Sequence, residues 1–137
     1  GMTDHGVLTS IDPDAERQAA ARKVLSLARI RSNQVRLITG TPLDVLPKLR
    51  DGAYDIVLIS GDRLEYVEYV SQALRLLRPG GVVVVNDALA NNHIADPDNE
   101  DDDTLIIRET LDSVLETEEF TPVLLPVGEG LLLATKS

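Results

Sequence analysis

The chain has 137 residues, of which 43% are hydrophobic, and a formal net charge of −10. This length suits one domain that buries about two-thirds of the surface of its unfolded chain, and with one Phe and no Trp the core must be aliphatic. The negative charge argues against a basic surface that would bind nucleic acid or an anionic membrane. The absence of cysteine excludes disulfides and thiolate metal sites and fits a reducing cytoplasm.

The first half of the chain predicts alternating strands and helices. Runs of apolar, largely β-branched residues indicate strands at 7–12, 35–40 and 54–59. Between them, apolar residues at helical spacing predict helices at 13–30 and 43–49. The first of these helices is expected to begin on its proline, because the missing N–H of a proline costs nothing in the first turn.

The second half continues the alternation. Apolar residues at helical spacing predict a helix at 64–77 that stops at the Pro-Gly-Gly beginning at Pro79, and a strand follows from Val82. Neither this strand nor the one at 54–59 alternates apolar and polar residues, which indicates cover by helices on both faces. An acidic loop at 88–103 then precedes an amphipathic helix at 104–118.

The last two apolar runs, 121–127 and 131–136, flank a Gly-Glu-Gly and therefore predict a hairpin. The final strand is thus expected to enter an otherwise parallel sheet in the antiparallel direction. The whole pattern indicates an α/β fold with a mostly parallel sheet, organised as a single domain over residues 1–137.

Polar residues follow two of the buried strands directly. Ser60, Asp62 and Arg63 come after the strand at 54–59, and Asn86 and Asp87 end the strand that begins at position 82. In an open α/β sheet, ligands bind beyond the carboxyl ends of the strands. These five residues are therefore expected to mark a site.

Five stretches of the chain carry a resemblance to a known family. They are VLTSIDPD at 7–14, VRLITGTPLDVLPKL at 35–49, YDIVLISGD at 54–62, ALRLLRPGGVVVVND at 73–87 and PVLLPVGEGLLLATK at 122–136. Together they resemble the class I S-adenosylmethionine-dependent O-methyltransferases of the catechol and caffeoyl-CoA type, especially the bacterial ones. The resemblance implies a three-layer Rossmann-like fold and methyl transfer to the hydroxyl of a small molecule.

The resemblance also implies a cofactor site for S-adenosylmethionine. The acid that ends the family's second strand holds the ribose hydroxyls, a role that falls on Asp12, although Asp12 also stands where a helix N-cap could be. The turn containing Thr41 and Pro42 would approach the adenine. Asp12, Thr41, Pro42 and Ser60 are accordingly the expected cofactor-binding residues.

The residues expected at the chemical end depart from the family's pattern. Ser60 stands where the family has a metal-binding Asp, Arg63 stands where it has a catalytic Lys, and Asn86-Asp87 reverses its Asp-Asn pair. With one anionic ligand lost and a permanently charged guanidinium added, we expect no divalent metal. Arg63 and Asp62 are the expected catalytic residues, and Asp62 could alternatively cap the next helix or pair with Arg63.

Three other features each have two interpretations. His93 could act as a base near an acceptor or could be an ordinary exposed loop histidine. The acidic run at 96–103 lacks the ligand spacing of a calcium loop and is expected to be solvated and mobile. Tyr66 and Tyr69, three apart on one helix, are expected in packing or in a subunit contact.

The family's first strand and glycine-rich turn should precede Val7, and only six residues do. The resemblance thus implies an N-terminally truncated version of the fold, in which we expect the strands at 7–12 and 54–59 to pair directly within a homodimer. The leading functional hypothesis is an O-methyltransferase. The alternative is a catalytically inactive module of the same fold that binds a ligand or serves dimerisation.

Overall fold

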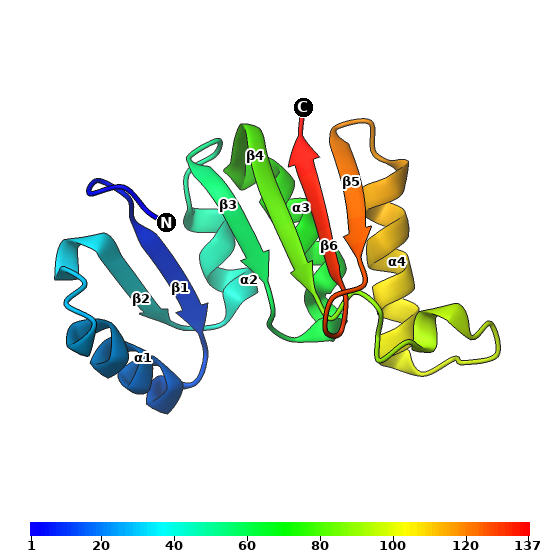
Figure 1. Ribbon diagram of the computed structural model, residues 1–137, viewed down its shortest axis with the longest axis horizontal. Coiled ribbons are helices and arrows are strands. Elements are labelled where there is room, and N and C mark those ends of the chain that lie inside the picture. The colour runs from blue at the N-terminus through cyan, green and yellow to red at the C-terminus, as the bar shows by residue number, and fades with distance from the viewer. The chain divides into compact units, whose positions relative to one another are not determined.

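The computed structural model describes residues 1–137, and the chain forms two compact units, residues 1–48 and 49–137. In the first unit, strand β1 (Leu8–Asp12) is followed by helix α1 (Ala15–Leu27) and strand β2 (Val35–Thr39), as Figure 1 shows. A 3₁₀ turn (Ser32–Gln34) leads into β2, and the unit ends with the short helix α2 (Pro42–Val45) and a further 3₁₀ turn (Leu46–Lys48). The two strands are parallel, with Leu8 opposite Val35 and Asp12 opposite Thr39.

Helix α1 begins two residues later than the sequence predicted. Asp14 is its N-cap, and the carboxylate accepts hydrogen bonds from the backbone N–H of Glu16 at 2.9 Å and of Arg17 at 3.1 Å. These bonds lower the pKa of Asp14. Pro13 therefore precedes the cap instead of opening the helix, and the alternative role of Asp12 as the N-cap is wrong.

A buried glutamine attaches α1 to the small sheet. Only 3% of Gln18 is exposed, and its Nε2 donates to the carbonyl of Ser10 on β1 at 3.1 Å and to that of Ile38 on β2 at 2.9 Å. A buried amide must find such partners. Helical spacing alone did not single out this residue, because it is polar.

The second unit contains a four-stranded sheet. Its elements in chain order are β3 (Tyr54–Ile59), a 3₁₀ turn (Arg63–Glu65), α3 (Tyr66–Leu76), β4 (Leu77–Asn86), a 3₁₀ turn (His93–Ala95), α4 (Asp102–Glu116), β5 (Phe120–Leu125) and β6 (Leu131–Lys136). The strand order is β3-β4-β6-β5, with β3 parallel to β4 and β6 antiparallel to both of its neighbours. The predicted hairpin and the antiparallel entry of the last strand are confirmed.

Strand β4 starts earlier than predicted. It begins at Leu77, directly after α3, and the Pro-Gly-Gly forms an irregular stretch of the strand: Tyr54 lies opposite Leu77, but Ile56 lies opposite Val82. Gly81 is needed in this stretch, since a Cβ there would lie 2.9 Å from the carbonyl oxygen of Arg78 and from a methyl group of Leu77. The irregularity absorbs extra residues without ending the strand.

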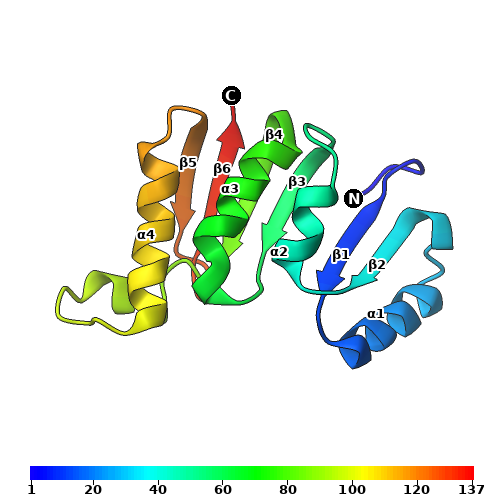
Figure 2. The same cartoon turned by 180° about the vertical axis from the view of Figure 1, so that it is seen from behind.

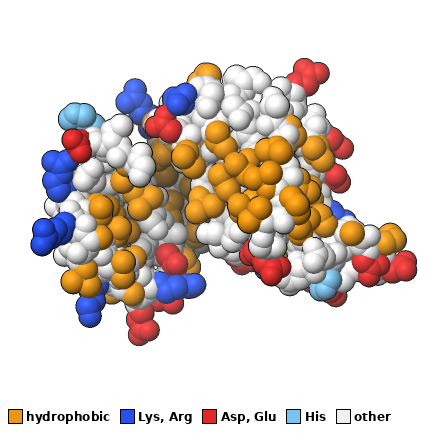
Figure 3. Space-filling view, viewed as in Figure 1, with side chains coloured by type: hydrophobic (Ala, Val, Ile, Leu, Met, Phe, Trp, Pro, Cys, Tyr) orange, Lys and Arg blue, Asp and Glu red, His pale blue; other side chains and the backbone are white.

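Helices α3 and α4 lie on the same face of this sheet, as the two opposite views in Figures 1 and 2 show. On that face Val83, Val85 and Leu132 are buried. The other face carries exposed apolar side chains, with Ile56 65% and Leu58 64% exposed, and a continuous apolar area covers it in Figure 3. The apolar runs predicted that helices would cover both faces of the sheet. The helices of this unit cover only one face.

The expected direct pairing of the strands at 7–12 and 54–59 is wrong. Strand β1 is hydrogen-bonded only to β2 and strand β3 only to β4, so the two belong to different sheets. Each forms its parallel ladder with the strand that follows it along the chain. One edge of β1 and one edge of β3 therefore have no strand partner.

Candidate active site

An arginine joins the carboxyl ends of β3 and β4 to the start of α4. Nη2 of Arg63 lies 3.2 Å from Oδ2 of Asp87, and Nη1 lies 3.4 Å from Oδ2 of Asp103. The side chains of Arg63 and Asp87 are about a quarter exposed, at 26% and 25%. Although burial opposes its charge, the two carboxylates raise the pKa of Arg63. The sequence predicted Arg63 and Asp87 at this edge but did not suggest Asp103, which comes from a distant helix.

The neighbouring candidates have different roles. Asp62 caps the 3₁₀ turn before α3, since its Oδ1 accepts from the backbone N–H of Leu64 at 3.0 Å. The expected cap is confirmed, whereas Arg63 pairs with Asp87 and Asp103 instead of Asp62. Ser60 is exposed, directly after β3.

The loop after β4 is held in an uncommon backbone conformation. Asp87, Ala90, Asn91 and Asn92 all have positive φ angles, between 47° and 67°, a region that costs about 1–2 kcal/mol for a residue with a Cβ. The backbone N–H groups that follow Asp87 donate to the turn before β6, from Ala88 to Gly130 and from Leu89 to Glu129, both at 3.1 Å. Strain of this kind is often found where a loop must present side chains in a fixed way.

The later part of the same loop is tied to α4 by Arg108, which the sequence did not single out. Its guanidinium donates to the backbone carbonyls of Asn99 at 2.7 Å, His93 at 3.1 Å and Ile94 at 3.3 Å, and also to that of Asp96. The acidic side chains of this loop are exposed as expected. Its backbone, however, is organised around one cation.

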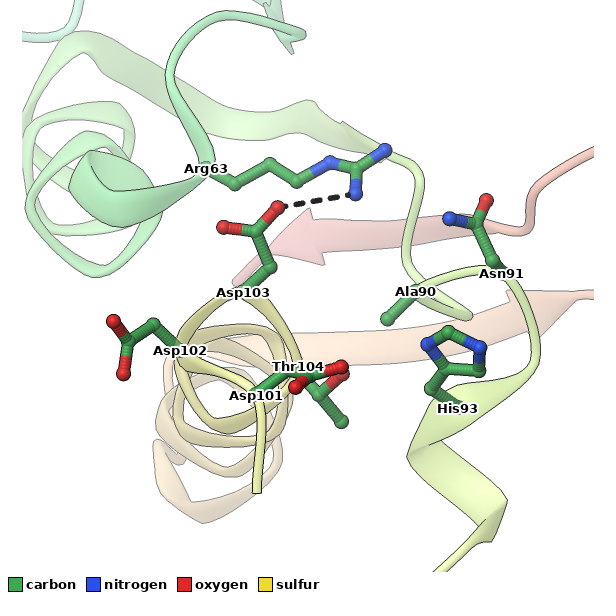
Figure 4. Close-up of a pocket in the computed structure, with 8 residues that line it drawn as sticks. All are labelled: Arg63, Ala90, Asn91, His93, Asp101, Asp102, Asp103 and Thr104. Atoms are coloured by element: carbon green, nitrogen blue, oxygen red, sulfur yellow. Dashed lines mark hydrogen bonds and ion pairs between the residues drawn. The ribbon is translucent and has the colours of Figure 1, made fainter. Parts of the chain in front are cut away.

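An open hollow lies between this loop, Arg63 and the first turn of α4, as Figure 4 shows. Its volume is about 340 Å³. The hollow is lined by Arg63, Ala90, Asn91, His93, Asp101, Asp102, Asp103 and Thr104. His93 is exposed and its side chain makes no hydrogen bond, so both interpretations of this residue stay open. The hollow lies beyond the carboxyl ends of the parallel strands, where ligands bind in this class of fold.

A second candidate edge lies in the first unit, at the carboxyl ends of β1 and β2. Oδ1 of Asp12 accepts from the backbone N–H of Asp14 at 2.8 Å, and Oδ2 lies 3.5 Å from Nε of Arg17. The backbone N–H of Gly40 donates to the Asp12 carbonyl at 3.1 Å, which brings the turn at Thr41 to the same edge. The Asp12 side chain is 29% exposed and Oδ2 can still accept, so the edge fits a pair of sugar hydroxyls.

The residues expected near a divalent metal do not fit one. Asp87 accepts a hydrogen bond from a permanent cation, Arg63, at 3.2 Å, and the serine after β3 offers a neutral hydroxyl where an anionic ligand would be needed. No three His, Cys, Asp or Glu side chains gather as a metal-binding group anywhere in the chain.

None of the helices combines the length and apolar character needed to cross a membrane.

Tyr66 and Tyr69 pack together in the core beneath Arg63. Their ring centroids are 6.3 Å apart, and 0% and 6% of the two residues is exposed, which confirms the expected role in packing. The Tyr69 hydroxyl donates to Glu65, but the Tyr66 hydroxyl is buried without a partner. Burial, and secondarily the negative charge of Asp87, raises the pKa of Tyr66 to about 12.

Comparison with known proteins identifies relatives along the whole chain. The family model of the O-methyltransferases matches residues 1–137. A relative from Mycobacteroides abscessus, whose name assigns it provisionally to the O-methyltransferases, is 40% identical over 136 residues, which is 99% of this chain and 63% of the relative. The chain therefore spans less than two-thirds of the length of that relative.

Two solved structures have the same fold. A crystal structure of a Corynebacterium glutamicum protein matches with a TM-score of 0.95 and 34% identity, over 100% of this chain and 63% of that one. The O-methyltransferase TomG from Streptomyces achromogenes, involved in tomaymycin synthesis and solved in complex with S-adenosylmethionine, matches with a TM-score of 0.91 and 26% identity, over 99% of this chain and 64% of that one. The α/β fold with a mostly parallel sheet and an antiparallel last strand is thus the Rossmann-like methyltransferase fold.

The unpartnered hydroxyl of Tyr66 generates a stability prediction. Replacing Tyr66 by Phe should leave the free energy of unfolding unchanged or raise it, because the change removes a buried hydroxyl that has no partner. The matched change Tyr69→Phe should lower it by about 1.5–3 kcal/mol through loss of the bond to Glu65. Urea denaturation of both variants measures the difference. A loss in Tyr66→Phe as large as in Tyr69→Phe would contradict the assignment.

Proposed function

The chain belongs to the O-methyltransferase family, and we propose that it transfers a methyl group from S-adenosylmethionine to a hydroxyl of a small molecule. The observation that carries the proposal is the match of the family model to the full length of the chain. The complex of TomG with S-adenosylmethionine supports the same cofactor here. Because the match runs through both units, we propose that they act as one domain, and the absence of cysteine supports a cytoplasmic location.

On the cofactor side, we propose that Asp12 accepts hydrogen bonds from the ribose hydroxyls. Its carboxylate is already oriented by the backbone of Asp14 at 2.8 Å, so little side-chain freedom is lost when a ligand binds. Thr41 and Pro42 at the start of α2 would lie against the adenine. In the second unit, we propose that Ser60, exposed at the end of β3, contributes a neutral hydroxyl to cofactor binding.

On the acceptor side, S-adenosylmethionine would supply an electrophilic methyl group on a sulfonium and leave as S-adenosylhomocysteine, while the acceptor hydroxyl must reach the methyl group in line and release its proton to water. We propose that Arg63 orients the acceptor oxygen and stabilises the negative charge that develops on it. Its position is set by Asp87 at 3.2 Å and Asp103 at 3.4 Å. Asp62 accepts the backbone hydrogen bond that caps the turn carrying Arg63. We propose it as the second catalytic residue, adjacent to Arg63 in the chain.

Calorimetric titration with S-adenosylmethionine and S-adenosylhomocysteine tests the proposal. Micromolar binding of both compounds is expected of a methyltransferase. Absence of binding would contradict the proposal and favour the inactive module. Product analysis by mass spectrometry, after incubation with a panel of hydroxylated small molecules, then separates an active enzyme from a domain that only binds the cofactor.

Asp12→Ala should weaken the binding of S-adenosylhomocysteine by about 1.5–3 kcal/mol, because a charged acceptor of the ribose hydrogen bonds is lost. Asp14→Ala is the matched control. It removes the N-cap of α1 and should lower helix stability by about 1 kcal/mol while leaving the affinity close to that of the unmodified chain. Calorimetry of both variants measures the affinity for S-adenosylhomocysteine, and thermal unfolding measures their stability. Equal affinities in the two variants would contradict the role of Asp12.

Methyl transfer should not depend on Mg²⁺, because Arg63 neutralises Asp87 and Ser60 supplies no charge. A chelator such as EDTA is expected to leave the rate unchanged, and titration with Mn²⁺ followed by electron paramagnetic resonance is expected to detect no ion bound with micromolar affinity. Ser60→Asp alone should not create tight binding, since Arg63 still holds Asp87. Strong inhibition by the chelator would overturn the prediction.

We further propose that the chain forms a homodimer through the open face of the four-stranded sheet. Ile56, Leu58 and Val123 on that face are more than half exposed, and monomers rarely leave a large contiguous apolar area in water. Sedimentation at micromolar concentration should give twice the mass of one chain. The Leu58→Lys variant should sediment with the mass of a single chain. A monomer for the unmodified chain would contradict the proposal.

A further inference from the structure

The hydroxyl of Tyr66 is the one side-chain oxygen or nitrogen in the chain that is buried without a hydrogen-bond partner. Tyr66 is 0% exposed and opens α3. Buried hydroxyls normally have a partner, and one that lacks it destabilises the folded state. Phenylalanine would fill the same space without this cost, so packing alone does not account for the hydroxyl.

Two charged groups of the candidate site act on this hydroxyl. Burial is the largest influence that raises the pKa of Tyr66, the negative charge of Asp87 raises it further, and the positive charge of Arg63 lowers it. Arg63 also lies one turn before Tyr66 in the chain. The three side chains therefore form one cluster, in which Arg63 and Asp87 are bonded to each other and Tyr66 is bonded to neither.

Asp87 is held in this cluster by its backbone. It follows β4 directly with a φ of 57°, and the next N–H group, that of Ala88, donates to the carbonyl of Gly130 at 3.1 Å. The carboxylate accepts from Arg63 through Oδ2, and only 25% of the side chain is exposed. If Arg63 moved away, the backbone of Asp87 could not follow. A partly buried carboxylate would then be left without its donor, which is costly.

The other carboxylate that binds Arg63 is in a different position. Nη1 of Arg63 lies 3.4 Å from Asp103, whose side chain is 54% exposed, so water can replace the guanidinium there. The proposed reaction requires Arg63 to present an N–H group to the acceptor oxygen. Of its two ion pairs, the one with Asp87 is therefore the one whose loss the protein must compensate.

We propose that Tyr66 is a positioning residue: when the guanidinium of Arg63 turns from Asp87 to a ligand, the hydroxyl of Tyr66 donates to the Asp87 carboxylate in its place. The hydrogen of a hydroxyl adjusts its direction to its partner, so the exchange requires only small side-chain movements. A hydrogen bond replaces an ion pair and no proton is transferred. This inference rests on the proposed function, because it takes the ligand of Arg63 to be the methyl acceptor.

A double-mutant cycle tests the exchange without any ligand. Arg63→Met removes the guanidinium and represents the state in which Arg63 has left Asp87; Arg63→Ala is the alternative background should Arg63→Met fold poorly. In either background, Tyr66→Phe should reduce the equilibrium constant for folding by at least about tenfold, because Asp87 loses its replacement donor. In the unmodified chain, Tyr66→Phe should cause no loss. Urea denaturation of the four chains gives the cycle, and equal effects in the two backgrounds would overturn the inference.

Matched variants locate the effect. Tyr69 donates to Glu65 within its own segment, so Tyr69→Phe should reduce stability equally with and without Arg63. Adding Asp87→Asn to Arg63→Met should shrink the effect of Tyr66→Phe to about threefold, because hydrogen bonds to an uncharged acceptor are about half as strong, and asparagine tolerates a positive φ. A background dependence of Tyr69→Phe as large as that of Tyr66→Phe would show general loosening of α3 and contradict the proposal.

Raman spectroscopy distinguishes a new hydrogen bond from a change in packing. The intensity ratio of the tyrosine doublet depends on whether the phenol hydroxyl donates, and subtracting the spectrum of the Tyr66→Phe variant from that of its parent leaves the contribution of Tyr66. The unmodified chain should give the ratio of an unbonded hydroxyl, and Arg63→Met that of a strong donor. The same ratio in both chains would refute the exchange.

Cofactor titration of the unmodified chain, carried out in parallel, separates the two proposals. If S-adenosylhomocysteine binds but Tyr66→Phe has no effect in the Arg63→Met background, the inference about Tyr66 fails and the proposed function stands. If the cycle and the Raman ratio show the exchange but neither cofactor form binds, the proposed function fails, and with it the assignment of the ligand of Arg63 as a methyl acceptor.

Discussion

The arrangement of the larger unit depends on the backbone ladders on both sides of β4. This strand is parallel to β3 on one side and antiparallel to β6 on the other, so its residues from Val82 to Val85 are paired on both sides. Its carboxyl end therefore delivers Asp87 to a defined position. The loop that follows is held in turn by the β5–β6 turn, where Gly130 has a φ of 88° and a Cβ would lie 2.4 Å from the Leu89 side chain. A hairpin at the end of the chain thus shapes the candidate site.

Within that frame, the candidate site is organised around one guanidinium shared by two carboxylates. Arginine suits this role better than lysine because its planar fork can bond to Asp87 and Asp103 at once and it does not lose its proton. The same interaction removes Asp87 from the ligands that a cation could use. In the proposed reaction, the fixed positive charge of Arg63 suits orientation of the acceptor oxygen better than its deprotonation.

Much of the fold could be predicted from sequence because its signals are local. The apolar run at 54–59 coincides with β3, and the Gly-Glu-Gly turn predicted the final hairpin. What the sequence did not reveal depends on partners that are distant in the chain. Gln18 is polar and was not assigned to a core, yet it bonds to two strands. Arg108 bonds to His93, which lies fifteen residues before it in the loop, and no periodicity encodes that contact.

The candidate residues divide in the same way. Asp62 as a cap could be predicted, since it immediately precedes a helix. The pairing of Arg63 with Asp103 could not, because forty positions separate them. The incorrect expectation that the strands at 7–12 and 54–59 pair came from reasoning about an incomplete sheet. Strand pairing follows the helical crossovers that connect β1 to β2 and β3 to β4, and no sequence signal favoured an additional ladder.

The central claim is that the chain binds the S-adenosyl cofactor, which we propose from the match of the O-methyltransferase family model. Backbone amide shifts of the ¹⁵N-labelled chain, titrated with S-adenosylhomocysteine, test it most directly. The account predicts saturable shifts at residues 12–14 and 41–43, where the ribose and adenine contacts are proposed, and none at Asp112 on the exposed side of α4. Shifts at Asp112 without shifts at residues 12–14 and 41–43, or no shift at millimolar ligand, would contradict it.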